Sequence, residues 1–227
     1  MSDRTFEVTD HDGVTVLSLG DDENRFSGPF AAGLRATLRQ TADPGGPLVI
    51  TGGGKFFSNG LDLEWLGGQE PDAVAAAFSD IYGLLADLLE YPGVVVSAIN
   101  GHAFGAGVMI SAVSDIRIQR EDRGFFCLPE VDLGMAMSPQ FDALLRAKYP
   151  TNVVLRALIS GERHGGPRAV EAGLVDEAVP ADQLLPRAIE IARGYVAKQP
   201  DTIHRIKAVQ HAEPIRILRE SPPTRPS

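Results

Sequence analysis

The sequence predicts an α/β domain with a helical carboxy-terminal region, and two patterns support this fold class. Short apolar runs rich in valine and isoleucine alternate with longer segments whose apolar residues recur every three or four positions. This alternation is typical of buried strands and amphipathic helices. From Pro139 onward the helical pattern predominates. A chain of 227 residues is long enough for one large hydrophobic core, so we expect a single domain over 1–227.

The first half of the chain contains five expected elements. Residues 7–19 alternate in polarity around a turn at 10–13, which indicates a hairpin. The other four are, in order, a helix over 29–41, a buried strand over 48–51, a helix over 72–90 and a buried strand over 94–99. Because Pro92 disfavours helical geometry in the residue before it, the second helix should end there.

The second half begins with a glycine-rich segment and becomes helical. The expected elements are, in order, a tight turn leading into a helix near Gly105, strands over 115–119 and 124–128, a mostly helical stretch over 139–159 and a helix over 181–196. The charged turn at 120–123 should separate the two strands. These elements complete the alternation of strands and helices that defines the fold class.

Composition and charge argue against several partners. The formal net charge is −9 with a pI near 5.0, and the 21 basic residues are scattered, so we expect neither nucleic acid nor a membrane as a partner. No segment has the pattern of a leader or a membrane span, which favours the cytoplasm. Cys127 is interpreted as an inert core thiol. The five histidines lack ligand spacing, so no metal site is expected.

Three common catalytic or nucleotide-binding motifs do not occur. A phosphate-binding loop requires glycine six positions before its lysine and serine or threonine directly after it. Lys55 has Val49 and Phe56 at these two positions. The glycines within 101–107 have the reverse of the dinucleotide-binding spacing. No Gly-x-Ser-x-Gly nucleophile motif is present anywhere.

Two glycine-rich segments, 52–60 and 100–107, each follow an expected strand. Small residues let a substrate approach the main chain, and the first N–H groups of a helix have no intrahelical acceptor. Such N–H groups stabilise negative charge, with help from the helix dipole. Either segment alone is more often a tight turn, whereas the two together favour a site that stabilises a developing anion.

Glu130 is the carboxylate most suited to act beside such a site. It follows Pro129 at the end of an apolar strand. A glutamate at a strand end is usually solvated, as we expect for Asp132 nearby. A carboxylate set among Phe125, Phe126 and Leu128 could instead be desolvated enough to serve as a base. The residues alone leave both interpretations open.

Three segments in the same order and separation resemble the crotonase (enoyl-CoA hydratase/isomerase) superfamily. They are KFFSNGLD at 55–62, INGHAFGAG at 99–107 and DRGFFCLPEVDLG at 122–134. The segment AVEAGLVD at 169–176 extends the resemblance over most of the chain. The resemblance implies a spiral of repeated β-β-α units, an acyl-CoA substrate, no separate cofactor and a homotrimer or pair of trimers. On this basis 1–195 would hold the core and trimerisation helices, and 196–227 a carboxy-terminal helix and frayed tail.

The resemblance also implies roles for particular residues. The backbone N–H groups of Leu61 and Ala106 would hold the thioester oxygen, although the family more often has glycine at the second position. Glu130 would be the catalytic residue. The implied substrate-binding residues are Phe57, Ser58, Asn59, Gly60, Gly105, Gly107 and Met109. Lys207 lies where relatives often place a base near the CoA phosphates, but it is equally interpreted as a solvated helix lysine, and we favour the latter.

One position distinguishes the possible reactions. Hydratases of this family use a second glutamate where this chain has Met109, and methionine can neither give nor take a proton. The motifs are most similar to the Δ3,Δ2-enoyl-CoA isomerase branch, in which a single carboxylate moves the proton. The alternatives are hydration or another acyl-CoA reaction, and an acyl-CoA-binding protein without turnover.

Overall fold

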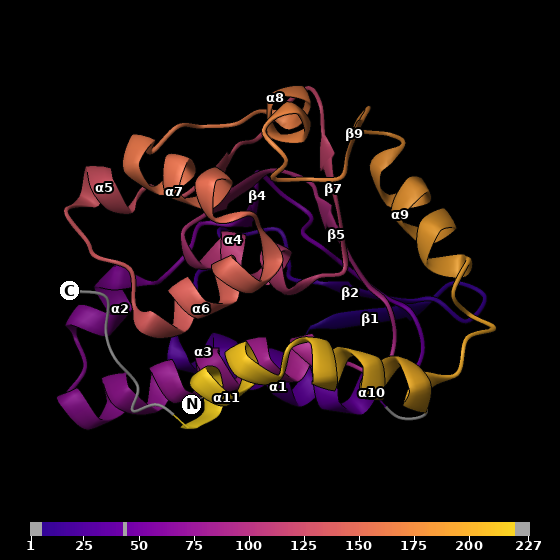
Figure 1. The fold of residues 1–227 in the computed structure, drawn as a ribbon, viewed down its shortest axis with the longest axis horizontal. Coiled ribbons are helices and arrows are strands. Elements are labelled where there is room, and N and C mark those ends of the chain that lie inside the picture. The colour runs from indigo at the N-terminus through magenta and orange to yellow at the C-terminus, as the bar shows by residue number, and fades with distance from the viewer. Residues whose placement is uncertain (1–5, 43–44, 221–227) are drawn as a thin grey trace.

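The computed structural model describes residues 6–42 and 45–220 and contains two β-sheets (Figure 1). The larger sheet has the strand order β1-β2-β3-β5-β7-β9, and the smaller has the order β4-β6-β8. The expected hairpin is confirmed, because β1 and β2 pair in antiparallel fashion, whereas the other pairings between the strands of the described residues are parallel. The strands are β1 (Glu7–Asp10), β2 (Thr15–Ser18), β3 (Leu48–Thr51), β4 (Phe56–Ser58), β5 (Val95–Ile99), β6 (His102–Phe104), β7 (Ile116–Arg120), β8 (Phe126–Cys127) and β9 (Glu177–Val179).

The spiral of β-β-α units is confirmed by how successive strands divide between the sheets. In three consecutive turns of the chain, β3, β5 and β7 enter the larger sheet, and β4, β6 and β8 enter the smaller one. The two strands expected over 115–119 and 124–128 therefore lie in different sheets. Because the smaller sheet is parallel, the carboxyl ends of its three strands meet at one edge, where the segments after Ser58, Phe104 and Cys127 come together.

The helices cover both sides of the larger sheet. They are α1 (Gly28–Thr41), α2 (Leu63–Gly67), α3 (Pro71–Leu89), α4 (Ala106–Val113), α5 (Glu130–Leu133), α6 (Pro139–Lys148), α7 (Thr151–Ser160), α8 (Gly166–Glu171), α9 (Leu184–Arg193), α10 (Pro200–Gln210) and α11 (Ala212–Glu220). Two helices, α10 and α11, occupy the region where one was expected. The expected frayed tail at 221–227 lies outside the described residues.

Alternate residues of the central strands pack into two separate hydrophobic clusters. Val95 and Ile99 of β5 face the larger cluster, which α1, α3, α4 and α6 also line, while Val96 and Ala98 face a smaller cluster with α9. A strand of a parallel sheet that is buried on both faces has a continuous apolar sequence, and this is how β5 could be recognised. Figure 1 shows α9 on the right-hand side of the sheet, with α4, α6 and α7 on the left.

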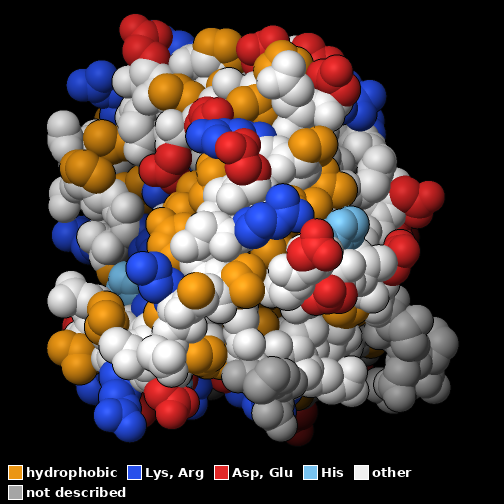
Figure 2. All heavy atoms as spheres, turned by 90° about the vertical axis from the view of Figure 1, so that its right-hand side faces the viewer, with side chains coloured by type: hydrophobic (Ala, Val, Ile, Leu, Met, Phe, Trp, Pro, Cys, Tyr) orange, Lys and Arg blue, Asp and Glu red, His pale blue; other side chains and the backbone are white. Residues whose placement is uncertain are grey.

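The face that carries α9 has a mixed surface. Figure 2 shows acidic and basic side chains interspersed there, with hydrophobic side chains between them. Ion pairs such as Arg187 with Glu177 and Arg193 with Asp12 account for part of this pattern. This face therefore lacks the basic stripe that nucleic-acid binding requires. Among the described residues, no helix is long and apolar enough to span a lipid bilayer.

Candidate active site

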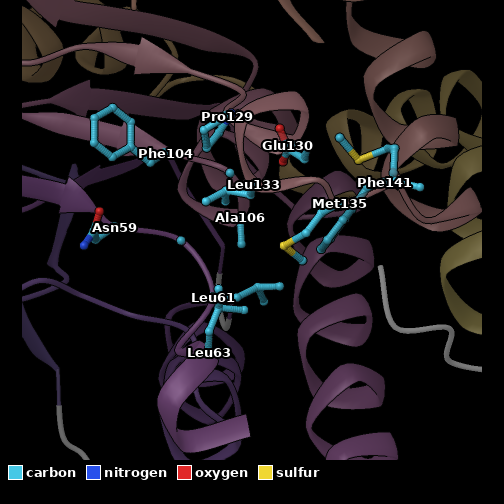
Figure 3. A pocket seen from close by; sticks show the side chains of 14 residues that line it. Asn59, Leu61, Leu63, Phe104, Ala106, Pro129, Glu130, Leu133, Met135 and Phe141 are labelled. Atoms are coloured by element: carbon cyan, nitrogen blue, oxygen red, sulfur yellow. The ribbon is translucent and has the colours of Figure 1, made fainter. Parts of the chain in front are cut away.

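A pocket opens where the carboxyl ends of the smaller sheet meet the segment after β8 (Figure 3). Its lining is mostly apolar. The lining residues are Asn59, Gly60, Leu61, Leu63, Phe104, Gly105, Ala106, Pro129, Glu130, Leu133, Met135, Ala136, Met137 and Phe141. Six sequence-predicted residues are thus brought together, namely Asn59, Gly60, Leu61, Gly105, Ala106 and Glu130. An apolar cleft with few polar groups is the usual form of a small-molecule site.

The first predicted donor, Leu61, lies in a loop that is pinned on both sides. Phe26 donates its N–H to the Gly60 carbonyl at 2.8 Å and accepts from the Asp62 N–H at 3.0 Å. These bonds use the groups that flank Leu61, and within the described part of the chain its own N–H has no acceptor. Asp62 then caps α2 by accepting from the Trp65 N–H at 3.1 Å. A loop held in this way can present a free donor to the pocket.

The second predicted donor, Ala106, begins α4. Gly105 precedes it with φ +49° and ψ −115°, a backbone conformation that favours glycine, and no side chain caps the helix. The Ala106 N–H accordingly has no acceptor among the residues that the structure describes. All eight residues of α4 are buried. The aligned peptide dipoles of this helix therefore act in an environment with little water, which strengthens their effect on an anion at its amino terminus.

The two donor loops approach each other so closely that side chains are excluded between them. A Cβ atom on Gly60, where φ is +82°, would lie 2.7 Å from the Phe104 carbonyl oxygen and 3.4 Å from the Ala106 nitrogen. A Cβ atom on Gly107 would lie 2.4 Å from the Ser58 carbonyl oxygen. Both glycines are therefore required for backbone contact, and this contact brings the Leu61 and Ala106 N–H groups to one pocket.

Glu130 lies across the pocket from these donors, at the start of α5. Its Oε2 atom is buried and has no hydrogen-bond partner among the described residues. A Cβ built on Gly105 would be 3.6 Å from Glu130 Oε1, so the carboxyl group faces the second donor loop. Burial raises the pKa of Glu130 to about 7, an effect that a backbone hydrogen bond partly opposes. The desolvated interpretation of this residue is therefore the correct one.

Four residues predicted to bind substrate do not line the pocket. Phe57, Ser58 and Met109 are buried behind the donor loops, as is Gly107. Ser58 Oγ donates to the Asn24 carbonyl at 2.7 Å and accepts from the Gly60 N–H at 3.2 Å, so it supports the first donor loop. The prediction of direct contact is corrected to one of support, because these residues are enclosed in the core and only their neighbours Asn59, Gly60, Gly105 and Ala106 reach the pocket.

Lys207 is also corrected, because it is neither solvated nor at the pocket. Its Nζ lies 2.8 Å from Asp115 Oδ2 and donates to the Gly93 carbonyl at 3.1 Å, and its side chain is 8% exposed. The same Asp115 oxygen accepts from the Val95 N–H at 2.8 Å. Lys207 thus fastens α10 to the start of β5, and its donors are engaged within the chain.

Neither His102 nor Cys127 lines the pocket. His102 packs against the rings of Phe56, Phe104 and Phe125, with centroids 5.1–5.4 Å away. Burial, aided by Lys55, lowers the pKa of His102. Cys127 is buried, and burial raises the pKa of its thiol to about 11, which confirms an inert thiol.

The sequence interpretation missed the hydrophobic side of the pocket. Met135, Ala136, Met137 and Phe141 line it, as do Leu63, Phe104, Pro129 and Leu133. The run MAM directly after Gly134 was the available signal, since methionines with no helical or strand periodicity commonly line adaptable sites. No group of three or more potential metal ligands is found within the described residues.

Comparison with known proteins agrees with this geometry. Residues 10–219 match the model of the family described as enoyl-CoA hydratase/isomerase. The chain belongs to that family. Among its relatives, enoyl-CoA delta isomerase 3 of Arabidopsis thaliana is 33% identical over 189 residues, which are 79% of each chain. The peroxisomal enoyl-CoA delta isomerase 2 of the same plant is 36% identical over 170 residues, or 70% of each chain.

A solved structure of this enoyl-CoA hydratase/isomerase family shows the same fold. The human mitochondrial delta3-delta2-enoyl-CoA isomerase superposes with a TM-score of 0.87 at 25% identity, covering 95% of this chain and 86% of that one. The predicted crotonase fold and the similarity to the isomerase branch are therefore both confirmed.

Proposed function

We propose that this protein is a Δ3,Δ2-enoyl-CoA isomerase in which Glu130 alone carries the proton. The observation that supports this most strongly is that Glu130 is the one titratable side chain among the pocket-lining residues. Moving a double bond from C3 to C2 removes one proton and returns one, so a single carboxylate suffices. The printed names of the Arabidopsis and human relatives point to the same reaction.

The proposed reaction needs no reactant other than the 3-enoyl thioester, because the proton removed from C2 is returned at C4. The Glu130 carboxylate removes a proton from C2 of the 3-enoyl thioester, and the electron pair delocalises over C2, C3, C4 and the thioester oxygen. The Leu61 and Ala106 N–H groups stabilise the negative oxygen. The carboxylic acid then delivers the proton to C4, which leaves the double bond between C2 and C3. A pKa of about 7 suits both steps near neutral pH.

Stabilisation of the negative thioester oxygen by the two N–H groups is expected to account for much of the rate enhancement. Removal of one oxyanion donor typically lowers kcat by about 10²–10³. Glu130 both removes and returns the proton, and no electrons are gained or lost, so the proposed reaction requires no metal or redox cofactor. Dialysis against a chelator is therefore expected to leave the rate unchanged.

Hydration is the less suited reaction. It requires one group to activate water and another to protonate the α-carbon. The position of the family's second glutamate is Met109, which is 1% exposed in the core. An acyl-CoA-binding protein without turnover is disfavoured for a different reason, since a binding site has no need for a desolvated carboxylate beside the thioester.

The test is an assay of the purified protein with 3-hexenoyl-CoA and, separately, 2-hexenoyl-CoA. We expect the absorbance of the conjugated thioester to rise with the first substrate. Rapid loss of absorbance with the second substrate would instead identify a hydratase, and no change with either would favour a binding protein. Glu130→Gln is expected to abolish turnover, whereas Asp132→Asn, an exposed carboxylate on the same short helix, should retain it.

Glu130→Gln should also remain folded, and we expect it to be more stable than the parent at pH 8. The ordinary pKa of 4.5 rises to about 7 on folding, so ionisation opposes folding increasingly from pH 4.5 to 7 and fully above pH 7. The corresponding cost is about 3 kcal/mol. A thermal melt at pH 8 in which Glu130→Gln unfolds below the parent would contradict the desolvated carboxylate.

The assembly and the compartment stay predictions. We expect a homotrimer or a pair of trimers, which sedimentation analysis would distinguish from a monomer. We expect the cytoplasm as the compartment, although two of the plant relatives are named as peroxisomal. Imaging of the tagged protein in its own cells would test that prediction.

A further inference from the structure

The direction of the acyl chain in the pocket follows from the proposed reaction. The Leu61 and Ala106 N–H groups fix the thioester oxygen and therefore C1. Glu130 must then reach C2 and C4, so the remaining carbons pass beyond it. Figure 3 shows Leu61 and Ala106 in the middle, Asn59 and Phe104 on one side, and Glu130, Met135 and Phe141 on the other. The distal acyl carbons therefore point toward Met135 and Phe141.

Phe141 forms a fixed wall at that end. It is 3% exposed and lies in the first turn of α6, where Ser138 caps the helix by accepting from the Phe141 N–H at 3.3 Å. The Tyr82 ring packs edge-on against the Phe141 ring, with centroids 5.3 Å apart and planes at 76°. Tyr82 also donates its hydroxyl to Ser138 Oγ at 3.2 Å. One tyrosine thus supports both the ring of Phe141 and its cap.

The other residues on this side are less constrained. Met135 and Met137 are half-buried, and a methionine side chain adapts its shape at low cost. They can move aside for an acyl chain, whereas Phe141 cannot move without displacing the buried Tyr82. The cavity is also small, at about 80 Å³. By comparison, an apolar cavity of roughly 150 Å³ holds one benzene molecule, so a bound acyl chain requires the methionines to shift.

We propose that Phe141, held by Tyr82 and Ser138, ends the acyl path and makes this protein selective for short-chain 3-enoyl thioesters. This inference rests on the proposed isomerase function for the direction of the chain. The substrate class is a straight-chain enoyl-CoA about as long as the hexenoyl group. The contribution of Phe141 is steric, so it should alter the preference for chain length more than the rate of the proton transfer.

The structure contains a matched control for this proposal. Phe30 occupies the same position of α1 that Phe141 occupies in α6, since Ser27 caps α1 by accepting from the Phe30 N–H at 3.3 Å. Phe30 is 1% exposed and packs edge-on against Phe26. It does not line the pocket. Substitution of Phe30 therefore removes the same core volume after the same cap without opening the acyl path.

The experiment compares kcat/KM for 3-hexenoyl-CoA and 3-dodecenoyl-CoA in the parent, Phe141→Leu, Phe141→Ala and Phe30→Leu. We expect the parent and Phe30→Leu to prefer the shorter substrate. The ratio of the longer to the shorter substrate should rise by about tenfold or more in Phe141→Ala. Phe141→Leu should show a smaller rise in the same direction and serves if the alanine variant does not fold.

Binding of hexanoyl-CoA and dodecanoyl-CoA, measured by calorimetry, separates this proposal from the proposed reaction. These saturated thioesters cannot isomerise. A shift in the relative affinity for the two chain lengths in the Phe141 variants would therefore support the role of Phe141 as the end of the acyl path, even if no variant turned over 3-enoyl-CoA. Equal use or tighter binding of the longer thioester by the parent would overturn the proposal. An unchanged ratio in folded Phe141 variants would also overturn it.

Discussion

The two loops that carry the proposed oxyanion donors are built differently, although each follows a strand of the same sheet and each has a glycine with positive φ directly before the donor. The Leu61 loop is held by hydrogen bonds from Phe26 and by the Asp62 cap. The Ala106 loop leads into a wholly buried helix with no side-chain cap. Polar contacts therefore position the first donor, whereas close packing positions the second.

This difference shows two ways in which the fold leaves a backbone N–H group free. At Leu61, the Gly60 carbonyl and the Asp62 N–H are both hydrogen-bonded to Phe26, and the Leu61 N–H between them is left without an acceptor among the described residues. At Ala106, the donor is free because the first N–H groups of any helix lack an intrahelical acceptor. We therefore expect steric changes to be most damaging in the Ala106 loop and loss of single polar contacts to act mainly in the Leu61 loop.

The largest effect is expected from Gly107→Ala. Its methyl group would lie 2.4 Å from the Ser58 carbonyl oxygen, so the two loops must separate and both donors move. We expect kcat/KM to fall by about 10³ and the free energy of unfolding by about 2–3 kcal/mol. Gly67→Ala is the control, because nothing lies within 4 Å of its added Cβ, and it should keep full activity.

A smaller effect is expected from Gly60→Ala, which displaces chiefly the Leu61 donor. Its Cβ would meet the Phe104 carbonyl oxygen at 2.7 Å, and its φ of +82° is unfavourable for alanine. We expect kcat to fall about a hundredfold. Gly173→Ala carries the same backbone strain, at φ +74°, with nothing within 4 Å of the Cβ. Equal activity of the two variants would mean that the loop contact does not position the donor.

The smallest effect is expected from Asp62→Ala, which removes the α2 cap. Loss of an N-cap costs about 1 kcal/mol of stability. Since Asp62 adjoins Leu61, kcat should fall severalfold with little change in KM. Ser27→Ala removes the cap of α1 and should cost similar stability at unchanged kcat. A kcat reduced equally in both variants would show that the Asp62 cap has no special relation to the donor.

The fold could be predicted from the sequence largely because its signals are local. The valine-rich run of β5 and the spacing of apolar residues in α3 indicated their structures directly. The residue pattern alone did not predict which sheet each strand joins, because β7 and β8 are both short and pairing partners are set by tertiary contacts. Only the family resemblance implied the spiral of β-β-α units.

The site was predictable where backbone groups form it. The glycines and a helix start indicated a site that stabilises an anion, and the family resemblance assigned its donors to Leu61 and Ala106. The burial of Glu130, in contrast, depends on a pocket whose lining extends to Phe141. Lys207 illustrates the limit most clearly. Its partner Asp115 is 92 residues away, so nothing near Lys207 in the sequence distinguishes a buried ion pair from a solvated lysine.

The central claim, that one desolvated carboxylate performs the proton transfer, is tested most directly by the pH dependence of kcat/KM with 3-hexenoyl-CoA. Glu130 must be ionised to remove the C2 proton, and burial raises its pKa to about 7. The predicted profile is a single rising limb with its midpoint near pH 7 and a plateau above it. A bell-shaped profile, which requires a second group acting as an acid, or a midpoint near the ordinary glutamate pKa of 4.5, would contradict the claim.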